Sequence, residues 1–430
     1  MALMLKNARL IDPQIGLDEV ADILIRDGRI VEVGHDLEMP KGVERDLSGK
    51  IVVPGLVDMH VHLRDPGQEQ KEDIASGTRA AAHGGFTAVC AMPNTDPVID
   101  NATGVEYVKS RADDVGKCRV LVSGACTKGL QGKQLADLGD MAEHGVVAFT
   151  DDGKGIQDAG MMRHVMEYAM QFDKPVMPHC QDSSLVGDGQ VNEGAASTRL
   201  GLAGWPAEGE ELEIARDIAL CRMTGCKLHI QHISTARGID MVREAKAEGL
   251  PVTCEATPHH MFLTEDDIDD TYPTSMKVNP PLRTREDAEA VMEGLLDGTV
   301  DCIVTDHAPH TDWESDREFE LAPFGMIGLE TSLGLVLTNL VNKGVMGFDR
   351  LVETMAVAPR RILGQEPVTI EPGSVADLTV FDPIEEWTVS RDGFYSKAGN
   401  SPYIGMTLKG RPTNVYVGGY ATMEDGVVVE

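Results

Sequence analysis

Histidine and aspartate residues follow several of the short apolar segments of this 430-residue sequence. His60 and His62 lie two residues apart after the segment that begins at Ile51, so on a strand both side chains would point to the same face. Further apolar segments are followed by the residues Asp151, Asp152, His179, His232 and Asp306. Imidazoles mixed with carboxylates, without a thiolate, are typical ligands of zinc and related transition metals. The pattern therefore predicts a metal centre.

The number of these residues exceeds the four ligands of one tetrahedral zinc ion. Two metal ions about 3.5–4 Å apart, bridged by one carboxylate, would use six of them. Such a centre lowers the pKa of bound water to about 7 and polarises carbonyl groups, which is the chemistry of metal-assisted hydrolysis. The residues alone do not decide whether Asp151 or Asp152 is the bridging ligand.

The elements that must position these residues are eight short apolar segments without strict alternation. They are Ile51–Asp58, Phe86–Met92, Arg119–Cys126, Val146–Thr150, Pro175–His179, Lys227–His232, Pro251–Glu255 and Cys302–Thr305. Helical patterns lie between most of them, at Glu72–His83, Asp158–Gln171, Glu210–Met223, Ala236–Ala247 and Glu286–Leu295. Buried parallel strands that alternate with helices predict an α/β fold, and eight of them predict a TIM-type (β/α)8 barrel. An open doubly wound sheet is the alternative, but no GxGxxG motif follows an early strand.

The two ends of the chain have a different pattern, with short alternating segments typical of antiparallel strands. The Asp27-Gly28 pair is a hairpin signal. Neither end alone is long enough for a stable sheet. We therefore expect residues 1–50 and 370–430 to form one composite β-sandwich beside a hydrolase barrel of residues 51–369.

The formal net charge of −32 argues against nucleic acid and acidic membranes as partners. An anionic substrate would need a local positive field, which metal ions and Arg64 could supply. The eight cysteines form no CxxC pair, and the sequence has no apolar stretch of about 18 residues. We expect a cytoplasmic protein.

Six motifs carry a resemblance to a known family. They are PGLVDMHVHLRDPG (54–67), AMPNTDPV (91–98), AFTDDG (148–153), KVNPPLR (277–283), TDHAPHT (305–311) and APFG (322–325). Together they resemble the dihydroorotases of the long bacterial type, over nearly the whole chain. The HxH pair with a distal TDH is shared by the cyclic amidohydrolase superfamily, whereas Arg64 with MPN and NPPLR is more specific.

The resemblance implies a zinc-dependent, reversible interconversion of N-carbamoyl-L-aspartate and (S)-dihydroorotate in de novo pyrimidine biosynthesis. It implies that His60, His62 and Asp306 bind one Zn²⁺, that His179 and His232 bind the second, and that Asp152 bridges the two. Asp306 would also transfer the proton during catalysis. The substrate would contact His62, Arg64, Asn94, Asn279, His310, Phe324 and Gly325.

Two other functions remain open. An allantoinase or hydantoinase would act on a ring without the same carboxylate and would generally bridge its metals with a carbamylated lysine, and here Lys154 is expected to face solvent. A non-catalytic scaffold for aspartate transcarbamoylase would typically lack metal ligands. We expect a homodimer, with aspartate transcarbamoylase as a candidate partner, and a mobile lid at Asp312–Glu320.

Overall fold

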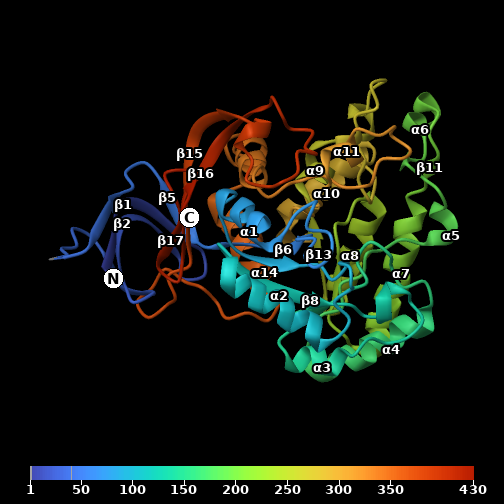
Figure 1. Cartoon of the computed structure of the whole chain (residues 1–430), viewed down its shortest axis with the longest axis horizontal. Coiled ribbons are helices and arrows are strands. Elements are labelled where there is room, and N and C mark those ends of the chain that lie inside the picture. Colours follow the sequence, from blue (N-terminus) through green and yellow to red (C-terminus); the bar gives the residue numbers. More distant parts are fainter. Residues whose placement is uncertain (1, 40) are drawn as a thin grey trace.

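Strands from both ends of the chain lie together at one side of the molecule, away from most of its helices (Figure 1). The computed structural model describes residues 2–39 and 41–430. Among these residues one sheet has the strand order β18-β17-β16-β15-β5-β1-β2-β3, and β4 also pairs with β1. The bounds are β1 Ala2–Asp12, β2 Leu17–Arg26, β3 Arg29–Gly34, β4 Val43–Asp46, β5 Ile51–Pro54, β15 Leu378–Thr388, β16 Thr407–Val417, β17 Tyr420–Glu424 and β18 Val427–Val428. A mixed sheet built from both ends is therefore confirmed.

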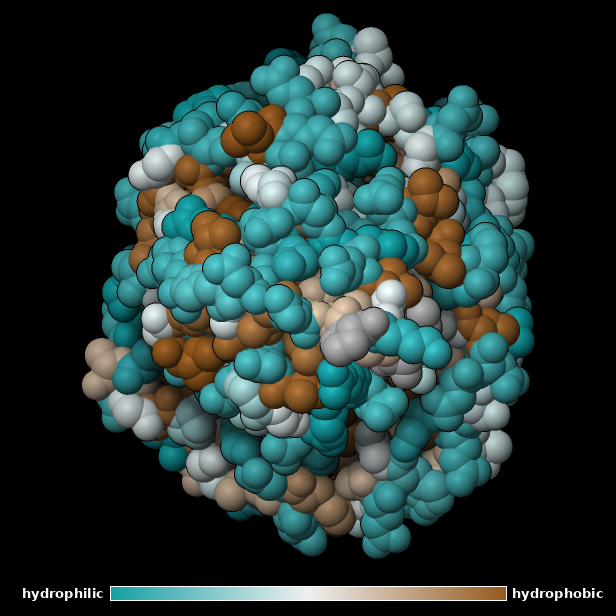
Figure 2. Space-filling model, turned by 90° about the vertical axis from the view of Figure 1, so that its left-hand side faces the viewer, coloured by the Kyte–Doolittle hydropathy of each residue, from teal (hydrophilic) through white to brown (hydrophobic). Residues whose placement is uncertain are grey.

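The hairpin between β2 and β3 follows from its two turn residues. Asp27 and Gly28 have φ values of 50° and 82°, the left-handed conformation that a two-residue hairpin turn requires at both positions. From the side of this terminal sheet, hydrophilic side chains cover most of the surface and hydrophobic ones form several separate groups (Figure 2).

The remaining strands pair in parallel in chain order. The strands β6 (Leu56–Val61), β7 (Phe86–Ala91), β8 (Arg119–Gly124) and β9 (Ala148–Phe149) form one sheet, and β12 (Leu228–Ile230), β13 (Val252–Ala256) and β14 (Cys302–Ile303) form another. Val176 joins the two sheets through parallel bridges to Phe149 and Leu228. A further parallel bridge, Val61 to His307, brings the order of pairing back to β6. All the strand ends that carry predicted site residues therefore lie on one ring.

Helices lie between these strands, and most of the longer ones have a side-chain cap at the first turn. The main ones are α1 (Ile74–His83), α2 (Ala102–Val115), α3 (Leu138–Glu143), α4 (Ala159–Ala169), α7 (Glu208–Thr224), α8 (Ala236–Ala247) and α10 (Arg285–Asp297). The pattern that predicted α1 began two residues too early, because Asp73 is the N-cap and its side chain accepts a hydrogen bond from the backbone N–H of Ser76. Shorter helices are α5 (Ser183–Val186), α6 (Ala195–Leu200), α9 (Pro258–Phe262), α11 (Asp312–Ser315), α12 (Ser332–Val336), α13 (Phe348–Val352) and α14 (Ala358–Ile362), and β10 (Val191–Asn192) pairs with β11 (Gly204–Trp205).

Two expected strands differ from the structure. The segment Ile51–Asp58 is two strands, because β5 pairs with β1 and β15 in the terminal sheet and only β6 enters the ring. Gly55 separates them where a side chain would collide with Thr87. The segment Pro175–His179 contains only the bridged residue Val176, since its two prolines have no N–H to donate to a ladder.

Across residues 2–39 and 41–430, no helix is long and apolar enough to cross a bilayer.

Candidate metal centre

A cavity of about 230 Å³ opens where the segments of the ring end. Its lining consists of His62, Arg64, Asn94, Asp152, Gly153, His179, His232, Asn279, Asp306, Ala308, His310, Phe324 and Gly325. These include every predicted site residue except His60, which lies fully buried beside Asp152 and Asp306. Residues from eight separate segments thus meet at one opening.

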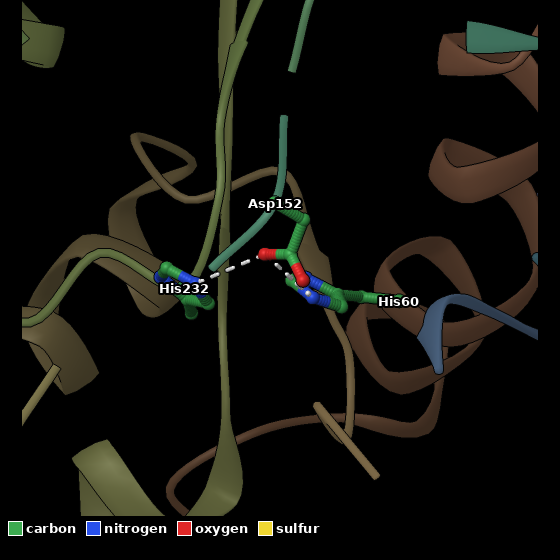
Figure 3. Close-up of side chains that lie close together, drawn as sticks. All are labelled: His60, Asp152 and His232. Carbon is green, nitrogen blue, oxygen red and sulfur yellow. Dashed lines mark ion pairs between the residues drawn. The ribbon is translucent and has the colours of Figure 1, made fainter. Parts of the chain in front are cut away.

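The centre of the cluster is His60. Its Nε2 lies 3.5 Å from Oδ1 of Asp152 and 3.5 Å from Oδ1 of Asp306. Figure 3 shows the carboxylate of Asp152 between the rings of His60 and His232, with His232 Nε2 3.9 Å from Asp152 Oδ1. The three side chains come from β6, from the turn after β9 and from the segment just after β12, so the order of pairing brings them together.

His62 completes the side of the cluster that faces Asp306. Its Nε2 lies 3.0 Å from Asp306 Oδ1 and 3.5 Å from Asp152 Oδ2. Its Nδ1 lies 2.9 Å from the amide oxygen of Asn94, and the amide nitrogen of Asn94 donates to Asp152 Oδ2 at 3.1 Å. Nδ1–H of His62 therefore donates to Asn94, and Nε2 is the nitrogen that faces the two carboxylates.

The side chains of Asp151 and Asp152 have different neighbours in the structure. Asp151 accepts hydrogen bonds from the backbone N–H and the hydroxyl of Thr127, so its carboxylate is bound to the neighbouring loop. Asp152 instead lies among the histidines, while Lys154 is exposed. The turn after β9 thus places Asp152, and not Asp151, beside the histidines.

Two overlapping groups have the spacing of metal ligands. One is His60, His62 and Asp306; the other is His60, Asp152 and His232; within each group the ligand atoms lie within 4.8 Å of one another. His179 lies beside the second group, its Nδ1 2.9 Å from His232 Nε2 and 3.7 Å from Asp152 Oδ1.

The hydrogen-bond partners of the imidazole nitrogens suit a metal site. Nε2 of His60, which faces Asp152 and Asp306, is buried and has no hydrogen-bond partner among the described residues. A buried imidazole nitrogen without a partner costs free energy. Nδ1–H of His60 donates to Glu255 Oε1 at 2.6 Å, as metal-ligating histidines usually donate to a carboxylate. The donor set of imidazole nitrogens and carboxylate oxygens suits zinc.

The charges in the cluster depend on one another. Burial would raise the pKa of Asp152 and of Asp306, but the neighbouring His60 and His62 hold both pKa values well below the ordinary value. Burial would likewise lower the pKa of His60, but Glu255, Asp152 and Asp306 raise it well above its usual range. The site therefore stabilises carboxylates together with positive charge.

Three residues of the cavity have a left-handed backbone although none is glycine. The φ values are 60° for Arg64, 28° for His232 and 48° for Asp306. Such conformations cost about 1–3 kcal/mol each and cluster at functional sites, where the surrounding structure enforces them.

The opposite wall of the cavity carries Arg64 and His310. The Arg64 side chain is buried, and no carboxylate of the described residues lies within ion-pair distance of it. Its Nε donates to Pro309 O at 3.3 Å, and burial lowers its pKa to about 10. His310 Nε2–H donates to Phe324 O at 2.8 Å, and burial together with Arg64 lowers the pKa of His310 to about 3. This wall offers a buried guanidinium without a counter-ion.

A backbone hydrogen bond joins the loop that carries Asn279 to the loop that carries Gly325. The N–H of Gly325 donates to Lys277 O at 2.8 Å, and Asn279 Nδ2 donates to Gln181 Oε1 at 3.1 Å. Gly325 has a φ of 133°, and a side chain there would collide with Ala308. Phe324 packs edge-on against Trp205, with ring centroids 5.8 Å apart.

Sequence reasoning missed residues that support the ligands. Glu255 contacts both His60 and His229, at 2.6 Å and 3.0 Å, and Gln181 contacts His179 Nε2 at 2.9 Å. Glu255 ends a predicted strand, so the rule that selected the ligands could have selected it as well.

Comparisons with known proteins show what this chain is similar to. Residues 49–238 match the family described as Dihydro-orotase-like. A dihydroorotase of Pelotomaculum thermopropionicum is 48% identical over 428 residues and covers 100% of both chains. A dihydroorotase of Geobacter metallireducens is 49% identical over 97% of this chain and 99% of its own.

Among solved structures, the L-hydantoinase (dihydropyrimidinase) from Arthrobacter aurescens superposes with a TM-score of 0.90 at 28% identity, covering 100% of this chain and 97% of its own. The dihydropyrimidinase from Brevibacillus agri, at 21% identity and a TM-score of 0.87, shares the fold over 100% of this chain and 96% of its own. The full-length identity to the curated relatives shows that this chain belongs to the dihydroorotase family.

Proposed function

We propose that this chain reversibly interconverts N-carbamoyl-L-aspartate and (S)-dihydroorotate, with two zinc ions held by the predicted ligands. The observation that carries the proposal is the cavity itself, which has a cluster of imidazoles and carboxylates at its base and a buried, unpaired Arg64 in its wall. A cyclic amide that bears a carboxylate matches both features.

Zinc bound at this cluster would lower the pKa of water to about 7 and polarise the amide carbonyl of the ring. We assign the binding of one ion to His60, His62 and Asp306, and of the other to His179 and His232, with Asp152 between them. The two overlapping ligand groups that share His60 support a pair of ions.

Asp306 would hold and move the proton. Its carboxylate is ionised at neutral pH, because the neighbouring imidazoles hold its pKa far below the usual range. Asp306 lines the cavity, so its carboxylate can accept a proton from the attacking water and deliver it to the departing ring nitrogen. In ring closure the same carboxylate removes the proton from the nitrogen.

Arg64 would bind the carboxylate of the substrate through two parallel hydrogen bonds. The amides of Asn94 and Asn279 and the neutral ring of His310 line the same cavity, and the backbone at Phe324 and Gly325 would contact the edge of the pyrimidine ring. This set distinguishes a ring with a carboxylate from one without.

The likeness to an L-hydantoinase makes a hydantoinase-like activity the second candidate. Asp152 in the centre and the exposed Lys154 favour dihydroorotase, since a carbamylated lysine would need to reach the ligands. Turnover of dihydroorotate, hydantoin and allantoin by the zinc-loaded protein separates the two. We expect turnover of dihydroorotate, and turnover of hydantoin or allantoin alone would reject our choice.

Elemental analysis of protein purified without chelator separates an enzyme from a scaffold. We expect about two zinc ions per chain, whereas nearly metal-free protein would favour a non-catalytic scaffold. The same proposal includes a (β/α)8 barrel with an adjoining β-sandwich and a reducing cytoplasmic location. It also includes a homodimer, assembly with aspartate transcarbamoylase and a lid at Asp312–Glu320. The closed parallel pairing and the eight buried free thiols support the first two.

A further inference from the structure

A segment between the terminal strands β15 and β16 reaches the cavity and contacts two of its loops. Its key residue is Asn400, which is 6% exposed. The amide nitrogen of Asn400 donates to the backbone oxygens of Ala308 and Gly325, at 3.0 Å each. Its amide oxygen accepts from the backbone N–H of His310 at 3.3 Å. One side chain thus forms hydrogen bonds to three residues that line the cavity.

These three residues belong to two separate loops. Ala308 and His310 follow Asp306, whereas Gly325 lies beyond α11. The loops pack so closely that an added side chain on Gly325 would lie 2.6 Å from the Cβ of Ala308. The loops are also joined directly, since the N–H of Ala308 donates to Met326 O at 2.8 Å, and Asn400 adds three hydrogen bonds at the same junction, opposite the carboxylates.

The segment that carries Asn400 is itself anchored. The buried carboxylate of Glu330 accepts from the backbone N–H groups of Tyr395 and Ser396, at 2.8 Å and 3.3 Å. Lys397 donates to the carboxylate of Asp73 at 2.5 Å. The contacts of Asn400 are therefore made from a fixed support and not from a free loop.

We propose that Asn400 is a positioning residue for substrate binding, which holds the loops of His310 and Gly325 at the spacing that the ring of the substrate requires. The inference rests on the proposed function for its consequence in catalysis. It acts through the backbone of its partners, so it affects binding and leaves the metal ligands in place.

The substitution Asn400→Asp tests this inference. Aspartate has the same shape, but its carboxylate cannot donate, so the oxygens of Ala308 and Gly325 lose their donor and face a negative charge. We expect KM for dihydroorotate to rise by about tenfold or more, with a smaller change in kcat and an unchanged zinc content.

Asn342→Asp is a control for the same loss of donors at an exposed site. The amide of Asn342 also donates to two backbone oxygens, those of Pro383 and Lys409, at 3.0 Å and 3.2 Å, and none of these residues lines the cavity. An equal rise of KM in both variants, or a KM for Asn400→Asp within twofold of the wild type, would overturn the inference.

Hydrogen exchange of residues 322–327 gives a readout that is independent of the substrate. We expect exchange to be about tenfold faster in Asn400→Asp and unchanged in Asn342→Asp. If the wild type fails to turn over dihydroorotate, the proposed function fails while this comparison still tests the contact. Unchanged exchange in both variants would refute the role of Asn400. Should Asn400→Asp not fold, Asn400→Ser, which retains one donor, takes its place in both measurements.

Discussion

Replacing Glu255 by glutamine tests how the protein orients the imidazole at the centre of the metal cluster. Glu255 is fully buried and accepts the Nδ1–H of His60 at 2.6 Å and the Nε2–H of His229 at 3.0 Å. Burial would raise its pKa, but His60 and His229 lower it to about 2, so it is a carboxylate at neutral pH. Glutamine keeps the shape and removes the charge.

The expected loss can be worked out from these contacts. A carboxylate that accepts from a metal-ligating imidazole fixes the ring and raises the basicity of the other nitrogen, and losing it typically lowers metal affinity 10–100-fold. That corresponds to about 1.4–2.7 kcal/mol of binding free energy. The Nε2 of His60 would still lie near Asp152 and Asp306, so we expect weaker binding of zinc and not its abolition.

The assay is a zinc titration of the chelator-stripped protein in competition with a metal buffer, followed by elemental analysis. Glu330→Gln is the matched control, because Glu330 is also buried and accepts the Nδ1–H of His83 at 2.7 Å, away from the cluster. A zinc affinity of Glu255→Gln within twofold of the wild type, or an equal loss in Glu330→Gln, would refute the reasoning.

Three further outcomes follow from the site. Asp306→Asn should lower kcat by about 10²–10⁴, measured on zinc-replete protein, and a loss of less than tenfold would exclude Asp306 as the proton carrier. Arg64→Lys should raise KM for dihydroorotate about 10–100-fold because lysine cannot form two parallel hydrogen bonds; steady-state kinetics with an unchanged KM would contradict this. The pKa of His310 is lowered to about 3 by burial and Arg64, so between that value and about 6.5 the unfolded state binds more protons and stability rises with pH. Denaturation at pH 7 and pH 5 should therefore show that His310→Gln loses about 2 kcal/mol less on acidification than the wild type, and equal losses would speak against a neutral His310.

Much of the local structure follows from local patterns. The helix expected at Ala236–Ala247 has those bounds in the structure, because Thr235 caps its first turn and the apolar residues repeat at the helical period. The Asp27-Gly28 turn needs only its two residues. The segment Pro175–His179 shows the limit of such patterns, since its apolar composition predicted a strand of full length and only Val176 is bridged to both neighbours.

Local patterns were enough to select the candidate metal ligands and to place His60 and His62 on one face, because the period of a strand and the position after an apolar segment depend only on nearby residues. The tertiary structure alone decided that Asp152 rather than Asp151 faces the histidines, that Glu255 supports His60 and that Asn400 contacts the loops of the cavity. These contacts join residues far apart in the chain. The geometry of the contacts depends on how the segments of the ring pair and on the direction in which the turns between them run. No local pattern contains that information.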